Sequence, residues 1–260
     1  MRGRHAQLWA GPGMTALDLF NLSGRIALVS GASRGIGHAI ATGLAEAGAT
    51  TFGLARSPAP ADGAYAYRQC DVTDVKEVAA LMAEVFAAHG RIDILVNAAG
   101  ITLPGGVAAD PAEAFRQTLA ANLTAVYDCC RLVVPYMQKG GGGSIVNVTS
   151  IGAEQGFPGN PGYAAAKGGL AAMTRALAVD YGPSGIRVNN LAPGYVRTAM
   201  TEASHSDPGR HAARAARTIL GRWGRAEEMV GAAIFLASSA SSYVTGTDLF
   251  VDGGWTAKGL

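Results

Sequence analysis

The stretch that decides the fold runs from Ile26 to Ala55 and reads IALVSGASRGIGHAIATGLAEAGATTFGLA. Its first five residues form a short apolar run typical of a buried strand, and its last six indicate a second strand. Between them, a glycine-rich turn leads into an alanine-rich amphipathic pattern that ends near Gly48. Strand, helix and strand in this order predict a βαβ unit, and therefore a parallel sheet.

The turn after the first strand is a candidate anion-binding site. Bare backbone at a helix N-terminus lets a pyrophosphate approach closely, and the free N–H groups and the helix dipole favour a negative charge. We therefore expect a dinucleotide to contact Gly31, Ser33, Arg34, Gly35, Ile36 and Gly37. A tight turn that binds no ligand is the alternative interpretation.

Length and composition limit the possible classes. The 260 residues suffice for one sizeable α/β core, and 49% hydrophobic against 15% charged residues indicate a globular chain. The net charge of +2 is too small to favour nucleic acid, and no apolar run is long enough to predict a membrane span. Three cysteines without metal-site spacing predict neither a metal site nor a disulfide framework, which makes the cytoplasm the default compartment.

The chain shows no internal repeat and no linker, so residues 14–260 are expected to form a single catalytic domain. Residues 1–13 lack the apolar segment of a secretory signal, and we interpret them as a disordered extension before a functional start at Met14. Further strands are predicted at 65–70, 92–96, 144–150, 186–191 and 247–251, and further helices at 74–89, 112–138, 161–181 and 226–238.

Candidate catalytic residues follow the 144–150 strand. Ser150 ends that strand, and Tyr163 and Lys167 lie one turn apart on the helix that begins at Pro161. A cation about 4 Å from a phenol is worth roughly 4 kcal/mol at an effective dielectric of about 20. At about 1.36 kcal/mol per unit, this interaction would bring the tyrosine pKa near 7. The pattern predicts Tyr163 as a general acid/base, with Ser150 holding a substrate oxygen. A surface tyrosine beside a solvated lysine is the alternative.

Three motifs occur in family order: the Gly31–Gly37 turn, Asn97-Ala-Ala-Gly100, and Tyr163 with Lys167 four residues later. Together they resemble the short-chain dehydrogenase/reductase family over nearly all of residues 22–255, although many relatives have a second asparagine where Ala98 stands. The resemblance implies an α/β, Rossmann-type, doubly wound fold with about seven parallel strands and helices on both faces. It also implies a fourth catalytic residue, Asn122, which kinks its helix and anchors a relay water.

The resemblance adds expected cofactor contacts from several loops. They are Asp71 and Val72 at the adenine, Asn97, Ala98 and Gly100 near the ribose, Pro193, Gly194, Val196 and Thr198 near the nicotinamide, and Tyr163 and Lys167 themselves.

The end of the second strand indicates which nicotinamide cofactor is bound. Apolar Ala55 and then Arg56 stand where an NAD site places an acidic residue. The guanidinium groups of Arg34 and Arg56 suit a 2′-phosphate, and no carboxylate is expected to repel it. The predicted cofactor is NADP(H), with NAD(H) as the alternative.

The segment from about 195 to 222 corresponds to a substrate lid in relatives. Its cationic side chains favour an anionic small-molecule substrate, although a solvated helix face explains them equally well: His205, Arg210, His211, Arg214, Arg217 and Arg222, against Glu202 and Asp207. The predicted reaction is hydride transfer to or from a carbonyl or secondary alcohol of a sugar, polyol or sugar acid. A 3-oxoacyl-thioester reductase and a non-catalytic NADP-binding sensor are the alternatives. By resemblance, the helices at 112–138 and 161–181 pair copies of the chain into a dimer or tetramer.

Overall fold

A computed structural model describes residues 15–104 and 110–259; the proposed extension at 1–13 and the start at Met14 lie outside the described residues. Within them, seven parallel strands form one sheet in the order β3-β2-β1-β4-β5-β6-β7. The strands are β1 (Ile26–Ser30), β2 (Thr50–Ala55), β3 (Ala66–Gln69), β4 (Ile94–Asn97), β5 (Gly143–Val148), β6 (Ile186–Pro193) and β7 (Asp248–Val251). The predicted doubly wound fold is confirmed, and the order reverses at β1, which pairs with both β2 and β4.

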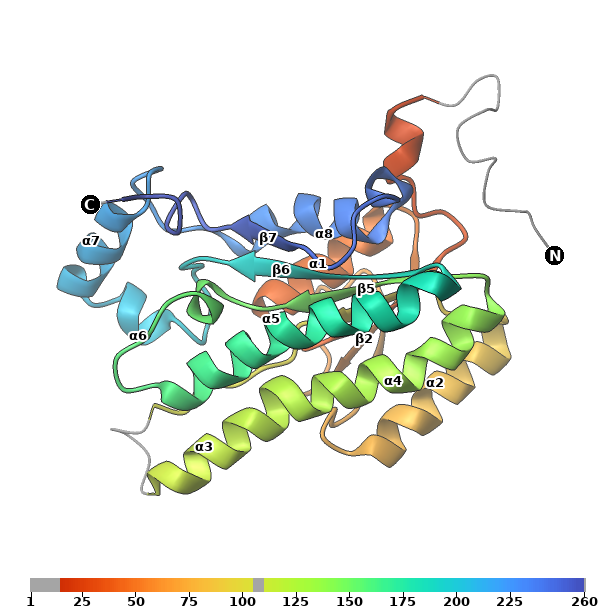
Figure 1. The fold of residues 1–260 in the computed structure, drawn as a ribbon, viewed down its shortest axis with the longest axis horizontal. Helices are drawn as coiled ribbons and strands as arrows, with labels where there is room; N and C mark the ends of the chain where they lie inside the picture. The colour runs from red at the N-terminus through yellow and green to blue at the C-terminus, as the bar shows by residue number, and fades with distance from the viewer. Residues whose placement is uncertain (1–14, 105–109, 260) are drawn as a thin grey trace.

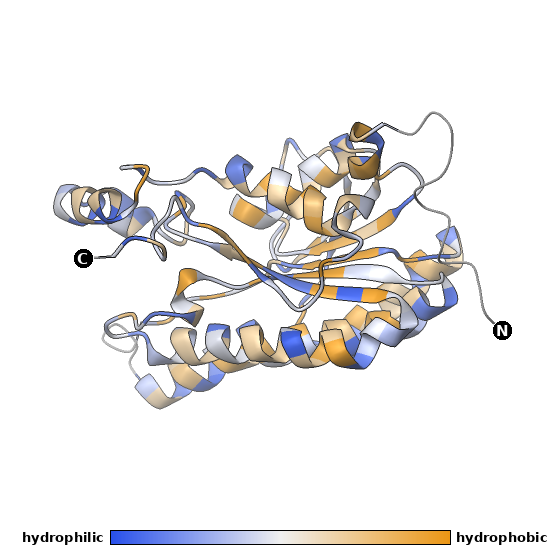
Figure 2. Ribbon diagram, turned by 45° about the horizontal axis from the view of Figure 1, so that its top comes forward, coloured by the Kyte–Doolittle hydropathy of each residue, from blue (hydrophilic) through white to orange (hydrophobic). Residues whose placement is uncertain are grey.

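Helices cover both faces of the sheet (Figure 1). On one face lie α1 (Gly35–Glu46) and α8 (Val230–Ala237), and on the other lie α2 (Val75–His89), α4 (Ala125–Lys139) and α5 (Pro161–Tyr181). Figure 2 shows the largely hydrophobic strands between these two helical layers. The prediction for α5 is confirmed at both ends. None of the helices in the described part of the chain combines the length and apolar character that a membrane crossing needs.

Shorter elements complete the chain. They are α3 (Pro111–Leu119), α6 (Glu202–His205), α7 (Pro208–Arg217) and five 3-10 turns at Leu17–Phe20, Ile151–Ala153, Gly182–Ser184, Ala226–Met229 and Ser239–Ser241. The α6 and α7 helices follow the carboxyl end of β6 (Figure 1). The helix predicted at 112–138 is present as an unbroken helical run, in which a π-helical turn at Ala120–Thr124 joins α3 to α4.

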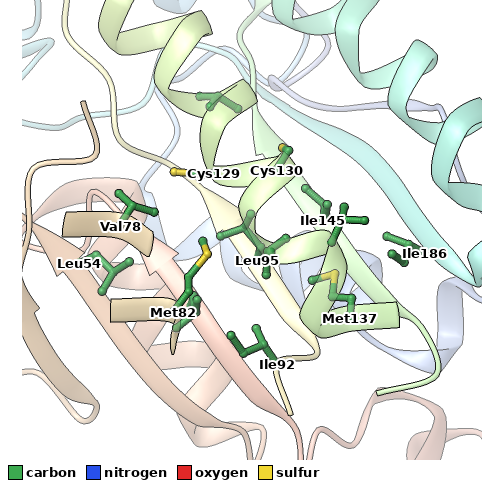
Figure 3. Close-up of a cluster of buried hydrophobic side chains, with 14 of the residues drawn as sticks. Leu54, Val78, Met82, Ile92, Leu95, Cys129, Cys130, Met137, Ile145 and Ile186 are labelled. Carbon is green, nitrogen blue, oxygen red and sulfur yellow. The ribbon is translucent and has the colours of Figure 1, made fainter. Parts of the chain in front are cut away.

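The larger hydrophobic core lies between the sheet and the layer of α2, α4 and α5. Figure 3 shows strand residues such as Leu95 and Ile145 meeting Met82 from α2 and the two cysteines of α4. Burial raises the pKa of the Cys129 thiol to about 12. Cys129 and Cys130 therefore pack as small apolar groups.

A row of polar residues crosses this apolar sheet at one register level. Asn97, Asn147, Asn190 and Asp248 pair in turn from β4 to β7. Their side chains form a continuous hydrogen-bonded chain, which we call the asparagine ladder. Asn97 Nδ2 donates to Asn147 Oδ1 at 2.9 Å, and Asn190 Nδ2 donates to Asp248 Oδ1 at 2.7 Å.

Thr174 of α5 supplies the link in the middle of the asparagine ladder. Its hydroxyl accepts from Asn147 Nδ2 at 2.9 Å and donates to Asn190 Oδ1 at 2.7 Å. Thr174 is fully buried, as are the two asparagines, so each bond replaces one that water would otherwise make. The ladder therefore fixes α5 to the strand ends on which the site is built.

The turn after β1 requires glycine at two positions because neighbouring backbone atoms lie very close. A Cβ on Gly37 would fall on the Gly31 carbonyl oxygen, and a Cβ on Gly31 would lie 2.7 Å from the Ala99 nitrogen. Gly31 also has a φ of +72°, in the region that favours glycine. The start of α1 and the end of β4 thus approach this turn more closely than a side chain allows.

We expect Gly37→Ala to lower the free energy of unfolding by about 1–3 kcal/mol, the usual cost of overpacking. The control is Gly231→Ala in α8, where a Cβ would meet nothing within 4 Å. That change should be neutral or should stabilise by up to about 1 kcal/mol through helix propensity. Urea unfolding of both variants measures the difference. An unchanged midpoint for Gly37→Ala would contradict the expectation.

Thr174→Val keeps the side-chain shape but leaves Asn147 and Asn190 each short of one partner. A buried polar group left unpaired costs about 1–3 kcal/mol, so we expect a loss of at least about 2 kcal/mol in unfolding free energy. Thr42→Val is the matched control, because the Thr42 hydroxyl is buried without a partner among the described residues. That control should not destabilise. Equal urea midpoints for the two variants would argue against the ladder's role.

Candidate active site

Three of the predicted catalytic residues meet at the carboxyl end of β5. Ser150 is buried just after the strand, and its Oγ accepts a hydrogen bond from Gly152 N at 3.0 Å. Tyr163 and Lys167 lie in the first two turns of α5. Lys167 is 5% exposed, and its Nζ donates to the Val148 carbonyl at 2.7 Å and lies 5.7 Å from the centroid of the Tyr163 ring.

Asn122 approaches the same place from the π-helical turn between α3 and α4. Its side chain is fully buried and binds both backbone groups of Ile101, with Oδ1 accepting from N and Nδ2 donating to O, each at 2.8 Å. A Cβ on Gly100 would lie 3.2 Å from Asn122 Oδ1 and 3.9 Å from Lys167 Nζ. The structure therefore brings Asn122 and Lys167 together beside Gly100, and Lys167 adjoins Tyr163, which in turn interacts with Ser150. The π turn is the helix distortion that the resemblance implied.

The predicted ionisation of Tyr163 is corrected by the structure. Burial raises the pKa of the phenol, and the opposing effect of the Ser150 side chain does not cancel it. The lowering of this pKa toward 7 that was expected from Lys167 is absent, and the lysine ammonium donates to the Val148 carbonyl. Burial also lowers the pKa of Lys167 itself, to about 8. The phenol is therefore protonated at neutral pH and is prepared to donate a proton.

The glycine turn fits a pyrophosphate group. Arg34 is the N-cap residue of α1 and makes no side-chain capping bond, whereas Asp74 caps α2 by accepting from Lys76 N and Glu77 N. The first-turn N–H groups of Gly35, Ile36 and Gly37 are thus not capped by a side chain, as an anion site at a helix N-terminus requires. The methyl group of Thr198 lies against this turn, since a Cβ on Gly35 would be 3.3 Å from its Cγ2.

The remaining predicted contacts lie on the neighbouring strand ends. Ser30 Oγ accepts from the N–H groups of Ala98 and Ala99 at 3.1 and 3.2 Å. Pro193 ends β6, and Gly194 lies so close to Asp252 that a Cβ there would be 2.7 Å from the Asp252 Cα. Val196 is buried, and its carbonyl accepts from Thr201 Oγ1 at 2.6 Å.

The side chain of Asn97 is partly engaged in the sheet and does not simply face a ligand. Its amide nitrogen belongs to the asparagine ladder, while its Oδ1 is buried with no partner among the described residues. The sequence analysis did not single out Asn147, Thr174 or Asn190, which hold it. One signal was available, because each of these apolar strands carries an asparagine near its carboxyl end.

The expected 2′-phosphate pocket also needs one correction. A carboxylate does lie beside Arg56, since Asp71 Oδ2 is 3.7 Å from its Nη1. Burial acts to raise the pKa of Asp71, but hydrogen bonds from Thr73 and the charge of Arg56 outweigh it and lower the pKa. Arg34 is exposed, and its guanidinium binds no other described residue. Ser33 lies beside Tyr67, whose hydroxyl donates to the Ser57 carbonyl at 2.6 Å.

Comparisons with known proteins agree with this geometry. A family model described as enoyl-(acyl carrier protein) reductase matches residues 31–256. Gluconate 5-dehydrogenase of Gluconobacter oxydans (strain 621H) is 40% identical over 255 residues, which cover 94% of this chain and all of the relative. The 3-oxoacyl-[acyl-carrier-protein] reductase FabG of Vibrio harveyi is 39% identical over 241 residues, covering 90% of this chain and 98% of the relative.

A solved structure gives the same picture in three dimensions. The gluconate 5-dehydrogenase from Burkholderia cenocepacia J2315, in complex with NADP and tartrate, superimposes with a TM-score of 0.88 at 38% identity. The match covers 94% of this chain and all of that one. From its motifs, its strand order and these relatives, the chain belongs to the short-chain dehydrogenase/reductase family.

Proposed function

We propose that this chain is an NADP-dependent oxidoreductase that interconverts a keto group and a secondary alcohol of a sugar acid. The observation that carries the proposal is the convergence of Ser150, Tyr163 and the buried Lys167 beside the uncapped glycine turn. The similarity to gluconate 5-dehydrogenases supports the sugar-acid class. A 3-oxoacyl-thioester reductase is the second candidate, because FabG of Vibrio harveyi is nearly as similar.

The chain's own residues suggest how the cofactor is held. The N–H groups of Gly35, Ile36 and Gly37 would bind the pyrophosphate, and the unpartnered Oδ1 of Asn97 is an acceptor close to the ribose side. The guanidinium of Arg34 is more available to a 2′-phosphate than that of Arg56, since Arg56 forms an ion pair with Asp71. When bound, the nicotinamide supplies or accepts the hydride.

The proposed catalytic side chains have different roles at the substrate oxygen. Gly152 N–H occupies a lone pair of Ser150 Oγ, so the serine hydroxyl is oriented to donate its proton to that oxygen. In the reductive direction, the protonated Tyr163 donates the proton. The Lys167 ammonium lies within a buried site, where its charge favours the tyrosinate that remains. We also propose that Asn122, next to Gly100, holds a water that returns the proton.

Two further proposals concern the surroundings of the site. Residues 195–222, which include α6 and α7, form the lid of a single catalytic domain that begins near Met14. Copies of the chain pair through α4 and α5, as exposed Tyr127 and Val179 support. The cytoplasm remains the expected compartment.

A substrate panel tests the proposed function directly. With keto sugar acids as substrates, we expect cofactor oxidation, with a higher kcat/KM for NADPH than for NADH because Arg34 is free to meet a 2′-phosphate. Turnover of acetoacetyl thioesters alone would select the second candidate. Tight NADPH binding without turnover of any substrate would select a sensor instead of an enzyme.

Tyr163→Phe should lower kcat by about 10²–10⁴-fold, because the proton donor is lost, while the variant still binds NADPH. The pH dependence follows from the raised tyrosine pKa. Alcohol oxidation needs the ionised phenol, so its rate should increase as the pH rises from neutral, and carbonyl reduction should decrease only at high pH. Stopped-flow and steady-state assays measure both. Tyr243→Phe, at a fully exposed tyrosine, is the control. A near-normal kcat in the Tyr163→Phe variant would exclude this role.

A further inference from the structure

A continuous surface of aromatic rings leads from the catalytic tyrosine to the lid. The Phe157 ring stacks beside Tyr163, with centroids 6.2 Å apart, and its centroid is 6.1 Å from that of Tyr195. Tyr195 in turn packs against Trp255 at 4.9 Å and Trp223 at 5.2 Å. We call Phe157, Tyr195, Trp223 and Trp255 the aromatic floor.

Arg214 of α7 lies on this floor. Its Cζ is 4.6 Å from the centroid of the Tyr195 ring and 6.0 Å from that of Trp223. Its Nη1 is buried and has no hydrogen-bond partner among the described residues. A cation–π contact is worth about 2 kcal/mol when desolvated, but it does not satisfy an N–H group that has lost water. The partly buried guanidinium therefore has unused donor capacity at Nη1.

The other arginines near the lid have polar partners. Arg197 lies 3.8 Å from Glu202, Arg210 lies 3.4 Å from Asp207, and Arg222 lies 2.6 Å from Glu228. Arg217 stacks on Trp255 at 4.7 Å in much the same way as Arg214 stacks on Tyr195, but its Nη2 donates to Gln155 Oε1 at 3.2 Å.

Asp207 is the acidic group whose charge interacts with Arg214. Its carboxylate already accepts from Arg210 N at 2.8 Å as the cap of α7, and it pairs with the Arg210 side chain. It forms no hydrogen bond or ion pair with Arg214 among the described residues. The positive charge of Arg214 is thus not neutralised by a direct ion pair within the described residues.

We infer that Arg214 binds the carboxylate of the substrate, with the sugar chain lying over Tyr195 and Phe157 toward Tyr163. This inference rests on the proposed function and names the residue that selects the anionic substrate class. A guanidinium matches a carboxylate with two parallel hydrogen bonds, and stacking on Tyr195 holds its plane in place before the ligand arrives. The C–H groups of the sugar chain would lie over the ring faces, which are a common contact surface for carbohydrate C–H groups.

The test compares Arg214→Met with Arg217→Met, using gluconate and the neutral six-carbon polyol glucitol as substrates with saturating NADP. We expect Arg214→Met to raise KM for gluconate by about 10–100-fold, as the loss of hydrogen bonds to a charged group implies, and to change kcat and KM for glucitol little. Arg217→Met should leave both KM values within about threefold. Arg214→Lys retains the charge without the planar fork, and should recover part of the gluconate affinity.

The possible outcomes separate the inference from the proposed function. Wild-type turnover of gluconate with an unchanged KM in Arg214→Met overturns the inference alone, and so does an equal loss on both substrates. Failure of the wild-type enzyme to act on any sugar acid overturns both. NADPH affinity and thermal unfolding of each variant show whether the site is still folded. A poorly folded Arg214→Met variant leaves Arg214→Lys to decide: a KM for gluconate equal to that of the wild type would overturn the inference.

Discussion

The buried ammonium group of Lys167 is the constraint around which the site is built. Its pKa of about 8 lies well below the ordinary value of 10.5, which corresponds to roughly 3 kcal/mol against the charged form. One hydrogen bond to the Val148 carbonyl offsets part of this cost. That carbonyl lies at the carboxyl end of β5 and accepts the hydrogen bond there, so the lysine depends on where the strand ends.

Sheet register then determines what surrounds the lysine. Parallel pairing places Ser30, Asn97, Asn147 and Asn190 at one register level, and the asparagine ladder links that level from Asn97 to Asp248 through α5. Polar residues in a sheet core are costly unless every bond is made, and here Thr174 completes the chain. The helix that carries Tyr163 and Lys167 is thereby anchored to the same row of residues that borders the glycine turn.

The residues proposed for the reaction and those proposed for selectivity come from different parts of the chain. The catalytic side chains come from the ends of β5, from α5 and from the π turn, all of which are tied to the sheet by buried contacts. The aromatic floor and Arg214 come mainly from the segments after β6 and β7 and from α7. If the proposed roles hold, changes after β6 alter which substrate is accepted while the proton-transfer groups stay in place.

Local patterns in the sequence were sufficient to predict the fold and to select the side chains proposed as catalytic. The apolar runs and the glycine turn predicted the parallel sheet, and Pro161 and Gly182 marked the ends of α5. These features depend on neighbours within a few residues, and the spacing of Tyr163 and Lys167 follows from helix geometry alone. The motifs also placed Asn122 within reach of the site, although the role of every one of these residues remains proposed.

Contacts between distant segments decided the rest. The π turn in the 112–138 segment coincides with the binding of Asn122 to the backbone of Ile101, and the pKa of Tyr163 is raised because several elements bury it together. Two further features could not be predicted from the sequence: the Asp71 carboxylate beside Arg56 and the unpartnered nitrogen of Arg214. Sequence alone determined which chemical groups the protein has and which secondary structures carry them. Only the tertiary structure decided the polarity and charge around each of these groups. The reason is that burial and ion pairing depend on residues far apart along the chain.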